Sequence, residues 1–230
     1  MITEKIVEVL VIGAGPSGCV SASYLQNNQV HVQIVEKAKF PRYVIGESLI
    51  PRCMDHFEEA DLLECLKKAG FEKKHGARFI KDGEVCHFDF SEKHGTGWDW
   101  TWQVPRDEFD MVLAKEVERK GVEIDFEKEV IDVLKTENGW KVTIQDINGH
   151  SEIIQAQFII DSSGYGRVLP RLLNLDKPSA LPDHSSIFTQ VKESKRPEGR
   201  EGSLITFDIL KRQLWFWVLP FSNGHTGIGF

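Results

Sequence analysis

A glycine-rich turn near the N-terminus constrains the fold of this chain more than any other feature. Residues 13–18 read GAGPSG, a GxGxxG pattern, and directly follow the β-branched run IVEVLVI at 6–12. In such a turn Gly13 permits a sharp change of direction, Gly15 lets a pyrophosphate approach the backbone, and Gly18 lets a helix pack on the strand. The pattern predicts a strand–turn–helix unit whose helix start presents free N–H groups to phosphates.

A helix, a second strand and an acidic residue follow at the spacing of a dinucleotide-binding unit. Residues 16–28 predict a helix, because a proline suits its first turn, and HVQIVE at 31–36 predicts a strand. Glu36 ends that strand about 20 residues beyond the turn, where a carboxylate accepts hydrogen bonds from ribose hydroxyls and disfavours NADP. The expected nucleotide-binding residues are Gly13, Gly15, Pro16, Ser17, Gly18, Glu36 and Lys37. This pattern alone does not separate FAD from NAD.

The remaining segments predict an α/β fold with a doubly wound, Rossmann-like nucleotide domain and an inserted β-rich domain. Helices are expected at 54–68 and 107–120, with Asp107 as an N-cap, and strands at 122–126, 129–135, 139–146, 151–156 and 158–161, the three from 129 to 156 as an antiparallel meander. The stretches 77–104 and 185–230 carry five of the six tryptophans and predict strands of a second sheet. We therefore assign 1–76 and 105–184 to the nucleotide domain, and 77–104 and 185–230 to the β-rich domain. Within the latter, 192–202 is the expected mobile polar loop.

Composition and charge exclude several classes of function. The net charge of −7 is mixed along the chain, which argues against a nucleic-acid surface, and no apolar run is long enough to span a membrane. The N-terminus lacks the features of a signal peptide, and the four cysteines lack CxxC spacing, so reduced thiols and a cytoplasmic location are expected. The histidines show no ligand spacing, and no metal is expected. The strand pattern GHTGIGF runs to Phe230, from which we expect a natural C-terminal portion beyond it.

Three further segments carry candidate contacts. FPR at 40–42 leads into IGESLIP at 45–51, VPRDEFD spans 104–110, and a strand ends at Asp161-Ser-Ser-Gly164. A serine-hydrolase elbow is excluded, because Ile50 stands where that motif needs glycine. From chemistry alone, Arg106 is either a phosphate or ribose contact or a surface arginine at a helix start.

In this order, GAGPSG, VEK, FPRYVIGESLIP, VPRDEFD and IIDSSG resemble the FAD-binding superfamily of p-hydroxybenzoate hydroxylase. Within it, the segments are most similar to flavin-dependent halogenases and the related geranylgeranyl reductases. The resemblance covers essentially the whole chain and implies FAD as the cofactor, an FAD domain and a β-rich substrate domain. The cofactor contacts that it implies, together with those of the later motifs, are Arg42, Gly46, Glu47, Ser48, Arg106, Asp161 and Gly164.

A tryptophan motif favours the halogenases within this superfamily. WFWVLP at 215–220 resembles their WxWxIP signature, with Leu219 in place of isoleucine. The resemblance implies that Trp215, Trp217 and Pro220 lie on the substrate side, where indoles keep organic substrate from a flavin hydroperoxide, so that halide reacts and hypohalous acid forms. Alternating core aromatics in a strand explain the same pattern, and explain the second ladder at 98–102 better still.

The segment GFEKKHGA at 70–77 resembles the halogenase stretch that holds a lysine which receives hypohalous acid. Lys74 has the matching spacing and is the expected catalytic residue, whereas Lys73 is one position off. Burial can lower the pKa of such an amine, which suits the role. Two solvated lysines after a helix are the alternative interpretation.

The resemblance implies a halogenase-like monooxygenase that acts through a flavin hydroperoxide on an apolar or aromatic small molecule. The alternative is an FAD-dependent reductase of isoprenoid double bonds, and a non-enzymatic nucleotide-binding module is a third reading. No second nucleotide fingerprint is visible, so a separate flavin reductase is an expected partner; relatives that bind NAD(P)H without a second motif leave the electron donor open. The family's second FAD contact, a GDAA-like turn, is not found before Phe230.

Overall fold

The predicted strand–turn–helix unit opens the chain. In the computed structural model, which describes residues 4–230, β1 (Glu4–Ile12) leads through the glycine turn into α1 (Pro16–Asn27), and β2 (Val32–Glu36) follows. β1 and β2 are parallel, with Val9 opposite Val32. All five residues of β2 are buried, as expected for a strand covered on both faces.

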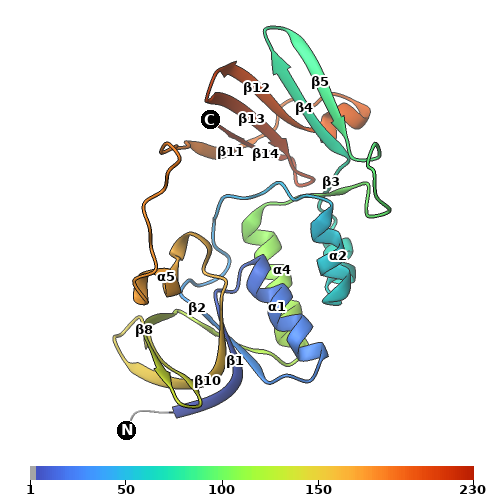
Figure 1. The fold of residues 1–230 in the computed structure, drawn as a ribbon. Helices are drawn as coiled ribbons and strands as arrows, with labels where there is room; N and C mark the ends of the chain where they lie inside the picture. The colour runs from blue at the N-terminus through green and yellow to red at the C-terminus, as the bar shows by residue number, and fades with distance from the viewer. Residues whose placement is uncertain (1–3) are drawn as a thin grey trace. The chain divides into compact units, whose positions relative to one another are not determined.

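The first sheet has six strands in the order β7-β2-β1-β10-β9-β8 (Figure 1). Its other members are β7 (Glu123–Phe126), β8 (Lys128–Thr136), β9 (Gly139–Asp146) and β10 (Ser151–Asp161). β7, β2, β1 and β10 run parallel, and β9 and β8 add an antiparallel edge. With α4 (Arg106–Arg119) as the crossover into β7, this arrangement confirms the predicted Rossmann-like α/β fold.

The core on one side of this sheet joins the parallel and antiparallel parts. Leu10 from β1, Val142 and Ile144 from β9, and Ile154 from β10 are completely buried there. The 3-10 turn η1 (Gly164–Gly166) leads into α5 (Val168–Leu172), whose leucines pack against this cluster. The turn after β10 is thereby attached to the centre of the sheet.

Two element predictions were wrong. The strands expected at 151–156 and 158–161 are one strand, β10, because its residues pair with β9 on one side and with β1 on the other. The helix expected at 54–68 is two helices, α2 (Arg52–Glu59) and α3 (Leu63–Ala69). Asp61 between them has a φ of +55°, and a left-handed residue cannot continue a right-handed helix.

A second sheet of six strands has the order β11-β14-β13-β12-β4-β5. Its strands are β4 (Gly76–Lys81), β5 (Glu84–Asp89), β11 (Phe188–Lys192), β12 (Ile205–Lys211), β13 (Leu214–Pro220) and β14 (His225–Gly229), with a 3-10 segment η2 (Gly199–Ser203) before β12. β12 pairs parallel to β4, with Ile205 opposite Ala77, so two distant stretches of the chain form one sheet as predicted. The end of the 77–104 stretch differs from the prediction, because β6 (Thr101–Gln103) pairs with β3 (Glu72–Lys74) in a separate small sheet.

The chain divides into two compact units. The first comprises residues 1–43, 59–65 and 107–180, and the second comprises 44–58, 66–106 and 181–230. These bounds differ from the predicted domains mainly in that 44–58 and 66–76 fall in the unit of the second sheet. The assignment of one domain to FAD and the other to substrate is a separate matter and stays a prediction.

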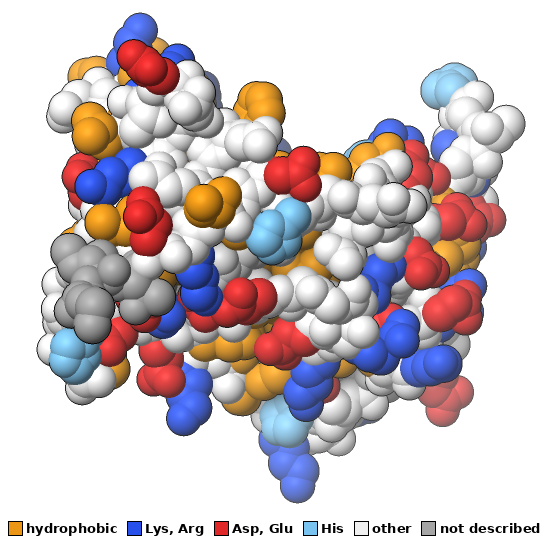
Figure 2. Space-filling model, turned by 90° about the horizontal axis from the view of Figure 1, so that it is seen from below, with side chains coloured by type: hydrophobic (Ala, Val, Ile, Leu, Met, Phe, Trp, Pro, Cys, Tyr) orange, Lys and Arg blue, Asp and Glu red, His pale blue; other side chains and the backbone are white. Residues whose placement is uncertain are grey.

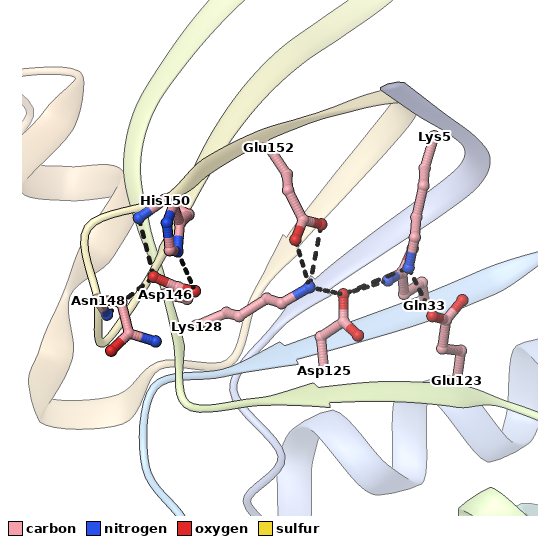
Figure 3. Close-up of polar contacts among 9 residues, drawn as sticks. All are labelled: Lys5, Gln33, Glu123, Asp125, Lys128, Asp146, Asn148, His150 and Glu152. Atoms are coloured by element: carbon pink, nitrogen blue, oxygen red, sulfur yellow. Dashed lines mark hydrogen bonds and ion pairs between the residues drawn. The ribbon is translucent and has the colours of Figure 1, made fainter. Parts of the chain in front are cut away.

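Charges in the first unit pair with one another across strands. Asp125 on β7 accepts hydrogen bonds from Gln33 on β2 at 2.9 Å and from Lys128 on β8 at 3.2 Å (Figure 3). Lys128 also contacts Glu152 on β10, and Lys5 on β1 contacts Glu123 at 2.5 Å. On the face seen in Figure 2, basic and acidic side chains of the described residues are interspersed. Among residues 4–230, no helix has the length and apolar character to cross a membrane.

Candidate functional site

The glycine turn of the first unit leaves no room for a side chain at Gly13 or Gly18. Gly13 has a φ of +99°, and a Cβ built on it would lie 2.7 Å from the carbonyl oxygen of Ser162. A Cβ on Gly18 would lie 1.9 Å from the carbonyl oxygen of Gly13, so the start of α1 sits directly on the turn. The predicted roles of these two glycines, a sharp turn and close packing of helix on strand, match this geometry.

The start of α1 fits the pyrophosphate of the expected FAD. Gly15 is the N-cap, no side chain caps the helix, Pro16 occupies the first turn, and that turn carries no acidic residue. Backbone N–H groups at a helix start that no side chain satisfies attract an anion, and the helix dipole adds to that attraction. The hydroxyl oxygens of Ser17 and Ser162 lie 3.3 Å apart beside this start.

Glu36 is built into the turn at the end of β2. Its side chain is buried; Oε2 accepts a hydrogen bond from the N–H of Ala14 and Oε1 from that of Ala38, both at 2.8 Å. The guanidinium of Arg42 lies 3.7 Å from Glu36 and donates to the carboxylate of Asp110 at 2.9 Å. Asp110 is fully buried on α4 and was missed by the sequence analysis, although it belongs to the VPRDEFD segment. Glu36, Arg42 and Asp110 thus form one charged group beside the glycine turn.

The remaining residues of the first unit that were predicted to contact the cofactor lie outside the glycine turn and have partners within the protein. The carboxylate of Asp161 accepts hydrogen bonds from the N–H groups of Ser163 and Leu169, so it stabilises the turn between β10 and α5. Gly164 in that turn has a φ of +57°. Lys37 lies on the surface in an ion pair with Glu129 at 2.8 Å. Asp107 lies in the first turn of α4, not at its N-cap, because the helix begins at Arg106.

In the second unit, the GES loop at 46–48 runs antiparallel beside β6. The N–H of Val104 donates to the carbonyl of Glu47 at 2.8 Å, and Ser48 forms a bridge with Gln103. Gly46 has a φ of +113°, and Arg106 donates to its carbonyl at 3.3 Å and to that of Ile45 at 3.2 Å. Arg106, predicted as an FAD contact, therefore holds the loop itself.

Lys74 on β3 reaches the same loop. Its ammonium nitrogen donates to Ser48 Oγ at 2.7 Å and to the carbonyl of Leu49 at 2.8 Å, and lies 5.2 Å from the centre of the Phe90 ring. The side chain is buried, and burial lowers the pKa of Lys74 to about 8. Its neighbour Lys73 is exposed and lies over the ring of Trp100. Of the two candidate lysines, the predicted one has the environment of a reactive amine.

The two tryptophans of the 215–220 motif lie on one face of β13. Trp215 is opposite Ile209 and Trp217 opposite Phe207 on β12. The carbonyl of Pro220 accepts a hydrogen bond from the amide nitrogen of Gln103 at 2.8 Å, which ties the end of the motif to β6. Gln103 was missed because its partners lie far away in the sequence.

The second tryptophan ladder is an edge-to-face stack. The ring centres of Trp98 and Trp100 are 5.4 Å apart and those of Trp100 and Trp102 are 5.2 Å apart, with nearly perpendicular planes. Only Trp102 is fully buried, and it lies in β6. This stack packs β6 on the side opposite to Lys74, as the alternating side chains of paired strands require.

Comparisons with known proteins give the family. The model of the FAD binding domain matches residues 6–181. A tryptophan 2-halogenase from Chondromyces crocatus is 34% identical over 162 residues, which are 68% of this chain and 30% of that protein.

Two solved structures extend the likeness over nearly the whole chain. A flavoprotein/dehydrogenase from Cytophaga hutchinsonii is 50% identical with a TM-score of 0.94, covering 98% of this chain and 55% of that one. A myxobacterial chondrochloren halogenase is 28% identical with a TM-score of 0.82, covering 98% of this chain and 52% of that one. The chain thus spans about half the length of these two solved structures, and less of the tryptophan halogenase.

Proposed function

The chain belongs to the FAD-binding domain family, and on that premise we propose that it works as a halogenase-like flavin enzyme on a small apolar or aromatic substrate. In this proposal Gly13, Gly15 and Gly18 receive the pyrophosphate at the start of α1. Glu36 and Arg42 bind the adenosine side, and the loop at 46–48 borders the flavin ring. When bound and reduced, FAD supplies O2 with the two electrons that make an oxidant for chloride or bromide.

The environment of Lys74 is the observation that carries the proposal. The amine is buried and anchored by neutral oxygens of Ser48 and Leu49, with a pKa lowered to about 8 by burial. With this pKa about a tenth of the lysine is neutral at pH 7, and the nitrogen of that fraction can act as a nucleophile. The nitrogen attacks the halogen of hypohalous acid; the oxygen–halogen bond breaks, and the departing hydroxide leaves as water with a proton from the amine.

Trp217 has a separate role in this proposal. Its indole on β13 forms part of an aromatic wall that keeps the organic substrate away from the oxidising cofactor, so that only halide reaches it. A separate flavin reductase is the proposed source of electrons. A cytoplasmic location remains an expectation from the sequence.

The test is turnover of the purified full-length protein with reduced FAD, O2 and an aromatic substrate panel, with and without chloride or bromide. The proposal predicts halide-dependent product and loss of that product in Lys74→Ala with FAD content unchanged. Lys73→Ala is the matched control, because this neighbouring lysine is exposed on the other face of β3. Full activity of Lys74→Ala would remove the assigned role of Lys74.

The reductase of isoprenoid double bonds has less support, because the tryptophan 2-halogenase and the chondrochloren halogenase are named for halogenation, and the flavoprotein/dehydrogenase is named for no isoprenoid substrate. It shares the FAD domain but needs neither halide nor O2. The same assay separates the two functions: product that forms anaerobically and without halide would favour the reductase.

A further inference from the structure

β14 carries two glycines that the proposed chemistry does not use. Gly227 and Gly229 are separated by one residue, so they lie on the same face of the strand. In the register of the sheet, Gly229 lies between Trp217 on β13 and Phe188 on β11, and Gly227 lies between Leu219 and Gln190. Cross-strand neighbours therefore flank β14 on both sides at two positions where it has no side chain of its own.

The indole of Trp217 occupies the space above Gly229. A Cβ on Gly229 would lie 2.3 Å from Cζ2 and 2.6 Å from Cη2 of that indole, and 2.8 Å from the carbonyl oxygen of Ile187. The Ile187 carbonyl cannot easily yield, because it accepts a hydrogen bond from the N–H of Phe230 in the continuing ladder. A methyl group at position 229 must therefore displace the indole.

Gly227 provides the same kind of space for the GES loop. A Cβ there would lie 2.9 Å from Oε2 of Glu47, whose Oε1 accepts a hydrogen bond at 2.7 Å from Gln190 on the next strand. The two glycines thus leave space for different groups: Gly227 for the GES loop and Gly229 for Trp217. Because of this difference, substitutions at the two glycines can be compared with each other.

We infer that Gly229 is a specificity-determining residue, which acts by leaving space for the indole of Trp217 against β14. The inference rests on the proposed function, in which that indole keeps organic substrate from the cofactor. With the indole displaced, a C–H bond of the substrate is exposed to direct oxygenation. Reduced FAD, when bound, would supply the two electrons for this oxygenation, in which one atom of O2 enters the C–H bond and the other is released as water with two protons.

The experiment is a double-mutant cycle with Gly229→Ala and Trp217→Phe, in the full-length protein. Phenylalanine lacks the Cζ2 and Cη2 atoms that the new methyl would strike. We expect Gly229→Ala to raise the ratio of hydroxylated to halogenated product about tenfold when Trp217 is present, and to leave it unchanged when Phe is present. Trp217→Phe/Gly229→Ala removes the conflict with the indole but keeps the 2.8 Å approach to the Ile187 carbonyl, so it separates an effect of the indole from an effect of the β11–β14 ladder.

A second readout does not depend on turnover. In FAD-free protein, the fluorescence of Trp217 is the difference between the spectrum of each protein and that of its Trp217→Phe counterpart. We expect the wavelength of this emission to shift in Gly229→Ala. We expect no shift in two control variants. The new methyl of Gly227→Ala would contact Glu47 instead, and that of Gly95→Ala has nothing within 4 Å.

The outcomes separate the two ideas. An unshifted emission, or a shifted emission with an unchanged product ratio, would overturn the role of Gly229 while leaving the proposed function intact. Turnover without any halide dependence in the unaltered protein would remove the proposed function and with it the specificity role, although the emission shift would persist.

Discussion

At the scale of single residues, two consecutive lysines on β3 have opposite environments, and this predicts a pH dependence of stability. Burial lowers the pKa of Lys74 from 10.5 to about 8, so between these pH values the unfolded chain binds more protons than the folded one. Stability then rises with pH in that window; the cost of the buried charge is fully present below it and absent above it. Replacing Lys74 by methionine removes this dependence.

We therefore expect the unfolding free energy of Lys74→Met, relative to wild type, to fall by about 3 kcal/mol between pH 7 and pH 10.5. Urea titrations at several pH values measure it. Lys73→Met, on the exposed side of β3, is the control for the loss of a lysine from this strand. A Lys74→Met difference that does not change with pH would mean that the amine keeps an ordinary pKa in the folded protein.

The same scale explains which site residues the sequence could reveal. Gly13 and Gly18 stood out because their roles depend on neighbours close in the chain. Lys74 was predicted because GFEKKHGA resembles the halogenase stretch that holds a reactive lysine, and its role stays a prediction. Asp110 and Gln103 gave no such signal, because one acts through Arg42 and the other through Pro220, and only the folded chain brings these partners together.

At the scale of elements, one arginine fixes the polar segment between β11 and β12. Arg196 donates to Glu193 within the segment, to Glu72 on β3 at 2.8 Å and to the carbonyl of Phe221 at 2.5 Å. The sequence suggested a mobile loop at 192–202 from its charge and glycine content. In the structure Arg196 joins the segment to β3, the strand that carries Lys74, and the mobility of the loop stays a prediction.

We expect Arg196→Met to lower the unfolding free energy by about 1–2 kcal/mol, because charge-assisted bonds to partly buried groups are lost. Cleavage by subtilisin between 193 and 203 should become faster, which mass mapping of the fragments detects. Arg200→Met is the matched control in the same segment: its ion pair with Asp89 is more exposed, so a change within about 0.5 kcal/mol is expected. If subtilisin cuts this segment equally fast in Arg196→Met and Arg200→Met, Arg196 does not anchor the segment.

At the scale of the whole molecule, the chain passes between the two units five times, at 43/44, 58/59, 65/66, 106/107 and 180/181. Local patterns identified the strands of the first sheet, with β10 as two segments, and the two stretches that hold the second sheet. They gave no signal for the parallel pairing of β12 with β4, whose residues are more than 120 positions apart. Nor could they show that 44–58 and 66–76 belong with the second sheet. Such long-range pairings depend on tertiary packing, which short sequence windows do not contain.

The order of these segments predicts what residues 1–180 can do alone. Every strand of the first sheet ends by Asp161, and all its core residues lie within this range, as do nearly all residues that match the family model. The second sheet would keep only β4 and β5, since its other four strands begin after 180, and a lone hairpin is marginal in water. We expect fragment 1–180 to retain the first sheet. Proteolysis should then cut it mainly within 66–106, whereas the intact chain resists there. Equally fast cutting within β1 and β10 would show that the first unit needs the second in order to fold.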